Sequence, residues 1–205
     1  ARALLEIGAE PAWLLGHSDA DDREVRDELG GVAGAYLLPS SPLLALRPDE
    51  AAYASLTTAM KTVACEVEDL APDALVIYSS RWYAVLDHLW QGRPHMAGFH
   101  VDENWHEFGA MRYDISIDVS LARVCALAAA REGIRSKLVN YAGFPLDSAT
   151  VSASHFVNPE GLLPSVVVAN NLYYDFQRTR RLGEIVAAQA LAQGKRVVVL
   201  VLGGL

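Results

Sequence analysis

The sequence predicts an α/β fold, a three-layer α/β/α sandwich around a largely parallel or mixed central sheet. Short apolar runs such as 165–169 and 196–202 contain no alternating polar residues, which is typical of strands buried on both faces of a sheet. Longer segments whose apolar residues recur at helical spacing lie between these runs. The chain has 205 residues, of which 52% are hydrophobic, so it can bury one sizeable core.

Residues 1–34 differ in composition from the rest of the chain, and we predict that they form a short helical N-terminal extension. An acidic run can cap a charged helical stretch within it, and paired glycines can end that helix. The main domain is then expected to span residues 35–205.

The main domain is expected to alternate strands and helices. Asp118 is placed to cap one helix and Gly133 to end it, while Gly194 ends the last helix. The expected elements are, in order, a strand from residue 35, a helix over 49–70, a strand over 74–78, a helix over 118–133, strands over 137–141 and 165–169, a helix over 175–193 and a strand over 196–202.

Charge and cysteine usage exclude some classes of partner. The formal net charge is −8 and the composition gives no basic footprint, so we expect neither nucleic acid nor a membrane surface as a partner. The longest apolar run, at the end of the chain, is too short to span a bilayer. Cys65 and Cys125 lie in helical patterns and make no disulfide framework, which predicts two reduced core thiols and a cytoplasmic location.

The block FHVDENWHEFGAMRYDISID, residues 99–118, is unusually rich in histidine and carboxylate side chains, which together suit a divalent transition metal. The spacing of His100 and His106, however, matches neither a helical i, i+4 pair nor a compact zinc pattern. The competing interpretation is a loop whose histidines and acids pair with Arg81, Arg93 or Arg112, with Trp105 and Phe108 as its anchors. The residues expected to line a pocket or a subunit contact are His100, Asp102, Asn104, Trp105 and His106.

Ligands of open α/β sheets bind outside the carboxyl ends of the strands, so the residues that follow each strand are the next candidates. They are Ser40 and Ser41, then Ser79, Ser80 and Arg81, then Asn170 and Asn171, and finally Gly203 and Gly204. None is a good metal ligand, because a hydroxyl is a weak neutral donor and a guanidinium offers no lone pair. Arg81 would instead bind a carboxylate, a phosphate or a phenolate.

Five segments carry a family resemblance in the same order along the chain. They are YLLPSSPLLALRPD, DALVIYSSRWYAVLDHLW, HVDENWHEFGAMRYD, FPLDSATVSASHFVNPEGLLPSVVVANN and the terminal VVVLVLGGL. Over residues 35–205 the chain resembles the class III extradiol ring-cleaving dioxygenases, and it is most similar to the non-catalytic subunit of 2-aminophenol 1,6-dioxygenase.

The resemblance implies which positions would hold a metal. Such enzymes bind Fe(II) with two histidines and a glutamate, and they use a further histidine as acid and base. The two histidine ligands correspond to Ser40 or Ser41 and to Arg81, and the acid/base histidine corresponds to Ser148. The glutamate would lie beyond Leu205, which raises the question of a missing C-terminal segment. The resemblance therefore implies no metal site in this chain and Fe(II) in a homologous catalytic partner.

Three functions follow as hypotheses. The first is a non-catalytic, structural or regulatory subunit of an aminophenol- or catechol-type dioxygenase. The second is an active or repurposed enzyme, in which Arg81 grips an aromatic or small anionic substrate and His100, His106 or His155 transfers a proton. The third is a module that binds a small aromatic or acidic molecule without ring cleavage, as in the Memo proteins. His155, seven residues after Ser148, is expected near the substrate pocket, although a structural role for this histidine is the favoured interpretation.

Overall fold

The computed structural model describes residues 30–203 of the chain. The helical extension predicted for the N-terminus therefore lies outside the described residues, apart from its last five positions. The elements are β1 (Gly31–Pro39), α2 (Leu43–Leu46), α3 (Ala54–Asp69), β2 (Ala74–Ala84), β3 (His88–Gln91), β4 (His95–His100), the 3₁₀ helix η2 (His106–Phe108), β5 (Met111–Ser116), α4 (Val119–Arg131), β6 (Ser136–Val139), α5 (Ser148–Val157), β7 (Ser165–Asn171), α6 (Phe176–Ala192) and β8 (Arg196–Gly203).

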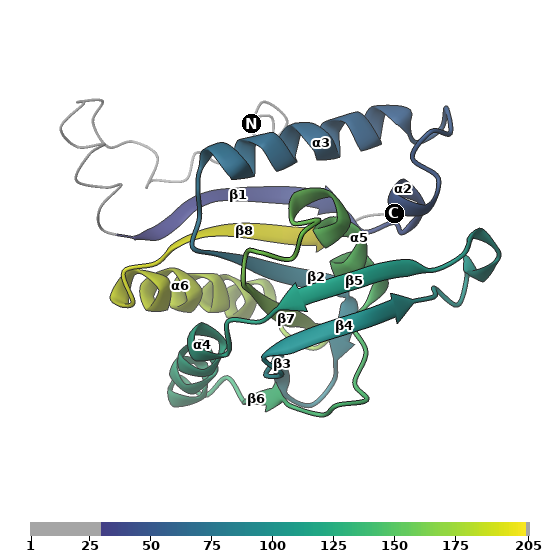
Figure 1. Cartoon of the computed structure of the whole chain (residues 1–205). Coiled ribbons are helices and arrows are strands. Elements are labelled where there is room, and N and C mark those ends of the chain that lie inside the picture. Colours follow the sequence, from purple (N-terminus) through teal and green to yellow (C-terminus); the bar gives the residue numbers. More distant parts are fainter. Residues whose placement is uncertain (1–29, 204–205) are drawn as a thin grey trace.

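Within this part of the chain, six strands form a mixed central sheet in the order β1-β8-β2-β7-β3-β6. The neighbours β1, β8, β2 and β7 are parallel, β3 runs antiparallel to β7, and β6 is parallel to β3. Strands β4 and β5 form a separate antiparallel pair, which lies beside the sheet (Figure 1). The α/β class and the mixed central sheet predicted from the sequence are confirmed.

Helices cover both faces of the sheet, as Figure 1 shows. Successive side chains of a strand point to opposite faces, so β2 feeds two cores. Leu75 and Ile77 pack with α2, α3 and α5, whereas Ala74 and Val76 pack with α4 and α6. A third core lies between the β4–β5 pair, α5 and the strand β7, and it includes Met96. None of the described helices combines the length and the apolar content needed to cross a membrane.

The helix ends follow the signals in the sequence. The Asp118 carboxylate accepts a hydrogen bond from the backbone N–H of Leu121 at 3.0 Å and so caps α4. Gly133 and Gly194 have φ values of +79° and +63°, a conformation that favours glycine, directly after α4 and α6. The expected capping and stop residues of these two helices are confirmed.

The first strand begins earlier than the sequence indicated. Gly31 opens β1, four residues before the strand start expected at residue 35, and its N–H donates to the carbonyl of Lys195 at 2.6 Å. A Cβ on Gly30 would lie only 2.7 Å from the backbone of Gly194. The glycines expected to end a helix therefore serve to bring the chain against the turn before β8.

Two further expectations are corrected. The block 99–118 is not a single loop, because it contains the end of β4, the 3₁₀ helix η2 and the whole of β5. Cys125 is buried as expected, but Cys65 lies on the exposed side of α3, so only one of the two free thiols belongs to the core.

Candidate functional site

Strand β2 carries a bulge that removes three residues from the sheet ladder. Ser79 pairs with Ala169 of β7, and the next paired residue of β2 is Tyr83, which lies opposite Asn170. The pairing of β2 with β8 ends at Ser79 as well. Residues 80–82 therefore stand opposite no residue of β7 or β8, and the bulge presents Arg81 at the carboxyl end of the strand. Bulges of this kind often re-aim a side chain next to a site.

The bulge brings Arg81 to the residue that follows β1. The Nε–H of Arg81 donates to the hydroxyl oxygen of Ser40 at 3.4 Å, and Ser40 is completely buried. These are two of the positions that the resemblance assigns to iron ligands. The neighbouring Ser41 faces α2 and α5 instead, since its hydroxyl accepts from the N–H of Leu43 and its carbonyl accepts from Ser152.

Asp147 connects Ser148, the position of the acid/base histidine, to the bulge of β2. Its carboxylate accepts hydrogen bonds from the Ser79 hydroxyl at 2.6 Å, from the Thr150 N–H at 3.0 Å and from the Thr150 hydroxyl at 2.6 Å. Asp147 thereby caps α5, and Ser148 is the buried first residue of that helix rather than part of a turn. The sequence held a signal for this cap, because aspartate is one of the residues preferred at the N-cap of a helix.

A cavity of about 400 Å³ lies where these residues meet. Trp82 and Phe144 form an aromatic wall, with ring centroids 5.7 Å apart and planes tilted by 54°. The polar groups of the lining come from the bulge, the end of β4 and the start of α5: Arg81, His100, Asp102, Glu103, Asn104, Asp147 and Ser148. The cavity therefore holds one guanidinium, three carboxylates and one imidazole.

The residues of the block 99–118 divide into two groups. His100, Asp102 and Asn104 line the cavity, and Asp102 is only 8% exposed, with its carboxylate accepting the N–H of Asn104 at 2.9 Å. Trp105 and His106 are not among the lining residues. Trp105 stacks on Phe108, whose ring in turn lies 4.9 Å from the guanidinium carbon of Arg47, and His106 is exposed beside Glu107.

The expected pairing of this block with arginines is not observed. Among the described residues, Arg81, Arg93 and Arg112 form no salt bridge with its acidic groups. Arg93 donates to the carbonyl of Ala142 instead. The Asp114 carboxylate has a histidine partner, with Oδ1 2.7 Å from Nε2 of His95.

The other histidines lie away from the cavity. His155 is exposed, packs edge-on against Phe156 and borders a small hollow beside Arg112 and Asp114 rather than the cavity. His88 is completely buried among the rings of Tyr78, Trp90 and Tyr174, and burial lowers its pKa to about 4.

The side chains at the expected iron positions do not fit Fe(II). Ser40 and Arg81 offer a hydroxyl and a guanidinium, whereas ferrous iron in such enzymes needs imidazole and carboxylate ligands. Ser148, at the position of the acid/base histidine, offers only a hydroxyl. Over residues 30–203, no three histidine, cysteine, aspartate or glutamate side chains are grouped so that they could hold a metal ion.

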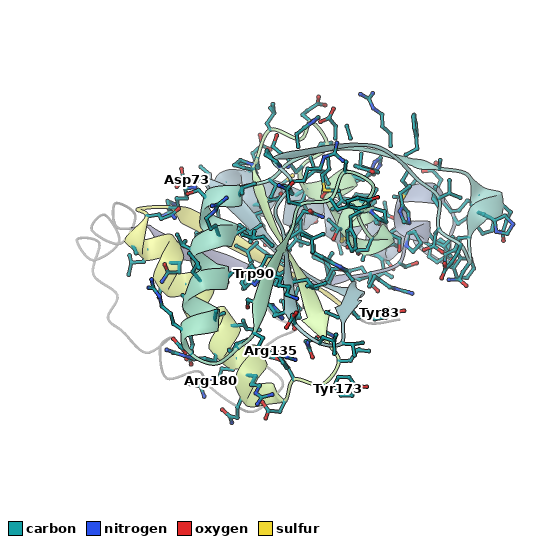
Figure 2. The ribbon with its side chains drawn as sticks, turned by 90° about the horizontal axis from the view of Figure 1, so that it is seen from below. Asp73, Tyr83, Trp90, Arg135, Tyr173 and Arg180 are labelled. Atoms are coloured by element: carbon teal, nitrogen blue, oxygen red, sulfur yellow. The ribbon has the colours of Figure 1, made fainter. Side chains whose placement is uncertain are left out.

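A second feature adjoins the cavity at Tyr83. Residues 83–86 and 172–176 lie side by side, since the N–H of Leu172 donates to the carbonyl of Ala84 at 3.0 Å. Figure 2 shows Tyr83 and Tyr173 projecting outward at the same end of the molecule. We call the six apolar side chains that are 49–75% exposed on these two segments the apolar patch: Tyr83, Val85, Leu86, Leu172, Tyr173 and Phe176.

The chain is similar to known proteins both in sequence and in fold. No protein-family model matches the chain. The chain is 41% identical to the 2-aminophenol 1,6-dioxygenase alpha subunit of Pseudomonas sp. over 175 residues, which is 85% of this chain and 65% of that protein. It is 29% identical to the 2-aminophenol 1,6-dioxygenase beta subunit of Pseudomonas sp. over 155 residues, which is 72% of this chain and 51% of that protein.

The chain thus spans about two thirds of the alpha subunit and about half of the beta subunit. The crystal structure of an uncharacterized protein from Escherichia coli K12 superposes with a TM-score of 0.52 and 14% identity, over 70% of this chain and 52% of that one. This last similarity concerns the fold alone.

Proposed function

We propose that the chain is a non-catalytic subunit. Its homology to both of these subunits makes it a member of the extradiol dioxygenase family. In this proposal the chain assembles with a homologous catalytic subunit, and that partner holds the Fe(II). The ring substrate of the assembly is an aromatic compound of the aminophenol or catechol type.

The observation that carries the proposal is the contact between Arg81 and Ser40. Arg81 stands where the family resemblance expects one histidine ligand, and Ser40 is one of the two candidates, with Ser41, for the position of the other. Neither Arg81 nor Ser40 can donate an electron pair strongly to iron. A permanent guanidinium charge also repels a divalent cation. At a separation of 4 Å that repulsion is on the order of 2 kcal/mol in water and 8 kcal/mol at an effective dielectric constant of 20. Arg81 is exposed, so the lower part of this range applies.

The proposed contact with the partner is the apolar patch. Its six side chains are each 49–75% exposed on two adjacent segments. Exposed apolar side chains that are grouped in this way are typical of protein–protein contact surfaces. A homologous subunit is the occupant that agrees with a family whose known relatives carry the names of alpha and beta subunits.

A second candidate function has one observation in its favour. Arg81 and His100 line the same cavity, so an anionic substrate held by Arg81 would have an imidazole nearby as a proton donor. His106 and His155 are less suited to this role, because neither lines that cavity. Turnover by the isolated chain separates this candidate from the first.

The test is co-expression with a homologue that keeps both histidines and the glutamate. We expect the two chains to purify together, with iron bound in proportion to the catalytic chain only. Replacing Tyr173 and Phe176 by serine should weaken the complex. Leu162→Ser is the matched control, because Leu162 is 81% exposed outside the patch. A chain that binds stoichiometric iron by itself, or that forms no complex and changes neither the stability nor the activity of the homologue, would overturn the proposal.

The cytoplasmic location expected from the sequence also remains part of the proposal. Its support is the pair of free thiols at Cys65 and Cys125, which suits a reducing compartment.

A further inference from the structure

We propose that the cavity beside the β2 bulge binds a small bipolar aromatic ring, with a carboxylate at Arg81 and an amino or hydroxyl donor at Asp102. The ligand is held and released without reaction, and in that respect the inference rests on the proposed non-catalytic function. A carboxylate ligand here takes the place that the family pattern would give to a metal.

Arg81 provides the anionic end of the site. Within the described part of the chain it forms no salt bridge, and its one hydrogen bond through the side chain goes from Nε to Ser40. The two terminal nitrogens of the guanidinium are thus left to a ligand. Their fork matches the two oxygens of a carboxylate, and such a charge-assisted pair is stronger than a neutral hydrogen bond.

The acidic side chains of the lining call for a hydrogen-bond donor on the ligand. Asp102 is buried at 8% exposure and accepts one backbone N–H, so its carboxylate retains acceptor capacity. Asp147 has less to offer, since its carboxylate already accepts three hydrogen bonds. Glu103 adds a further negative charge at the lining.

The charges of the lining argue against a simple anion. The lining holds one guanidinium and three carboxylates, so a ligand with only a negative group would meet more repulsion than attraction. A ligand with both a carboxylate and a polar N–H or O–H satisfies both kinds of group. The imidazole of His100 can donate to or accept from either end.

The middle of the site suits an aromatic ring. Trp82 and Phe144 present apolar ring surfaces to the cavity, and aromatic rings pack favourably in tilted or offset arrangements. A volume of about 400 Å³ lies within the range of pockets that bind small molecules.

Tyr83 links this site to the partner surface, because it lines the cavity and also belongs to the apolar patch. A ligand and a partner subunit therefore meet at one side chain. By linkage, any effect of the ligand on the affinity of the partner equals the effect of the partner on the affinity of the ligand.

The experiment is calorimetric titration of the isolated full chain with 3- and 4-aminobenzoate, benzoate and aniline. We expect at least one aminobenzoate to bind about tenfold or more tightly than either single-ended probe, the difference expected for one added hydrogen bond to a charged group. Arg81→Gln should weaken aminobenzoate and benzoate but not aniline. Asp102→Asn should weaken aminobenzoate and aniline but not benzoate. Arg180→Gln, on the exposed side of α6, is the matched control and should change none of them.

Each other outcome contradicts the inference. No binding of any probe, equal affinity for all probes, or unchanged aminobenzoate affinity in Arg81→Gln would overturn it, once circular dichroism has shown that the variant is folded. Arg81→Lys keeps the charge without the fork and should retain part of the affinity. If the chain forms the complex with a catalytic homologue but binds no probe, the inference fails and the proposed function stands. If the chain binds aminobenzoate but no partner subunit, the proposed function fails and the inference about the cavity stands.

Discussion

The Ser79 hydroxyl donates to the Asp147 carboxylate at 2.6 Å and thereby ties strand β2 to the start of helix α5. The same hydroxyl oxygen accepts the backbone N–H of Arg81 at 3.2 Å. The position of Arg81 thus depends on the carboxylate of Asp147, which lies 66 residues further along the chain. The helix cap and the site share one group.

Replacing Asp147 by alanine should destabilise the protein by about 2 kcal/mol, since a helix cap and a buried hydroxyl lose their acceptor together. Urea unfolding measures the change. Asp175→Ala removes the cap of α6, where the carboxylate accepts the N–H of Arg178 at 2.8 Å in an exposed position, and should cost about 1 kcal/mol or less. Equal losses in the two variants would contradict the role assigned to Ser79.

Stability should fall as the solution is acidified through the range set by His88. Burial holds the folded pKa of His88 at about 4, below its ordinary value of 6.5. As the pH falls from 6.5 to 4, the unfolded chain takes up a proton that the folded chain does not, so folding loses on the order of 3 kcal/mol from this group. Below pH 4 both states are protonated and the loss stops.

The variant His88→Phe removes this contribution. Its free energy of unfolding, measured against pH by chemical denaturation, should fall less steeply than that of the unaltered protein between pH 6.5 and 4. His106→Gln, a change at an exposed histidine, should retain the original slope. Parallel pH curves for His88→Phe and the unaltered protein would show that His88 is not the group responsible.

Two glycines should respond to alanine with opposite signs. Gly161 has a φ of +64°, and a Cβ there would lie 2.2 Å from the carbonyl oxygen of Asp114, so Gly161→Ala should cost about 3 kcal/mol or more. Gly183 lies inside α6 with no atom within 4 Å of an added Cβ, so Gly183→Ala should stabilise by up to about 1 kcal/mol. Denaturant midpoints report both, and a shared sign would refute the comparison.

The two thiols should react at very different rates. Burial, followed by the charge of Asp118, raises the pKa of Cys125 to about 12, whereas Cys65 is exposed on α3. A thiol reagent at pH 8 should modify one cysteine quickly and the other about a thousandfold more slowly, or only after unfolding. Cys65→Ser should abolish the fast phase, and a fast phase that survives this change would place the reactive thiol at Cys125.

The parts of the fold that the sequence predicted are those with local signals. Asp118 caps α4 through a hydrogen bond to a residue three positions later, and Gly133 and Gly194 end α4 and α6 within their own turns. Such features need no knowledge of distant segments. The buried strands of the central sheet were equally clear, because their apolar residues are continuous.

The missed parts depend on pairing between segments. Strands β4 and β5 carry charged residues on their exposed side and gain their core contacts only when Met96 and Ile115 meet β7 and α5. The bulge of β2 is invisible in the sequence, since it exists only as a shift in register against β7. The rule that strand ends form the site brought Ser40 and Arg81 together. The composition of the block 99–118 indicated separately that Asp102 lines a pocket, but it did not indicate that this pocket is the one at Arg81.

The bulge has a consequence for how the family can vary. Residues 80–82 stand outside the pairing of β2 with β7 and β8, so a substitution there leaves the ladder of the sheet intact. A change at Arg81 therefore does not disturb the strand pairing on which the folding of the domain depends. A single substitution can thus exchange the chemistry of this position while the domain still folds.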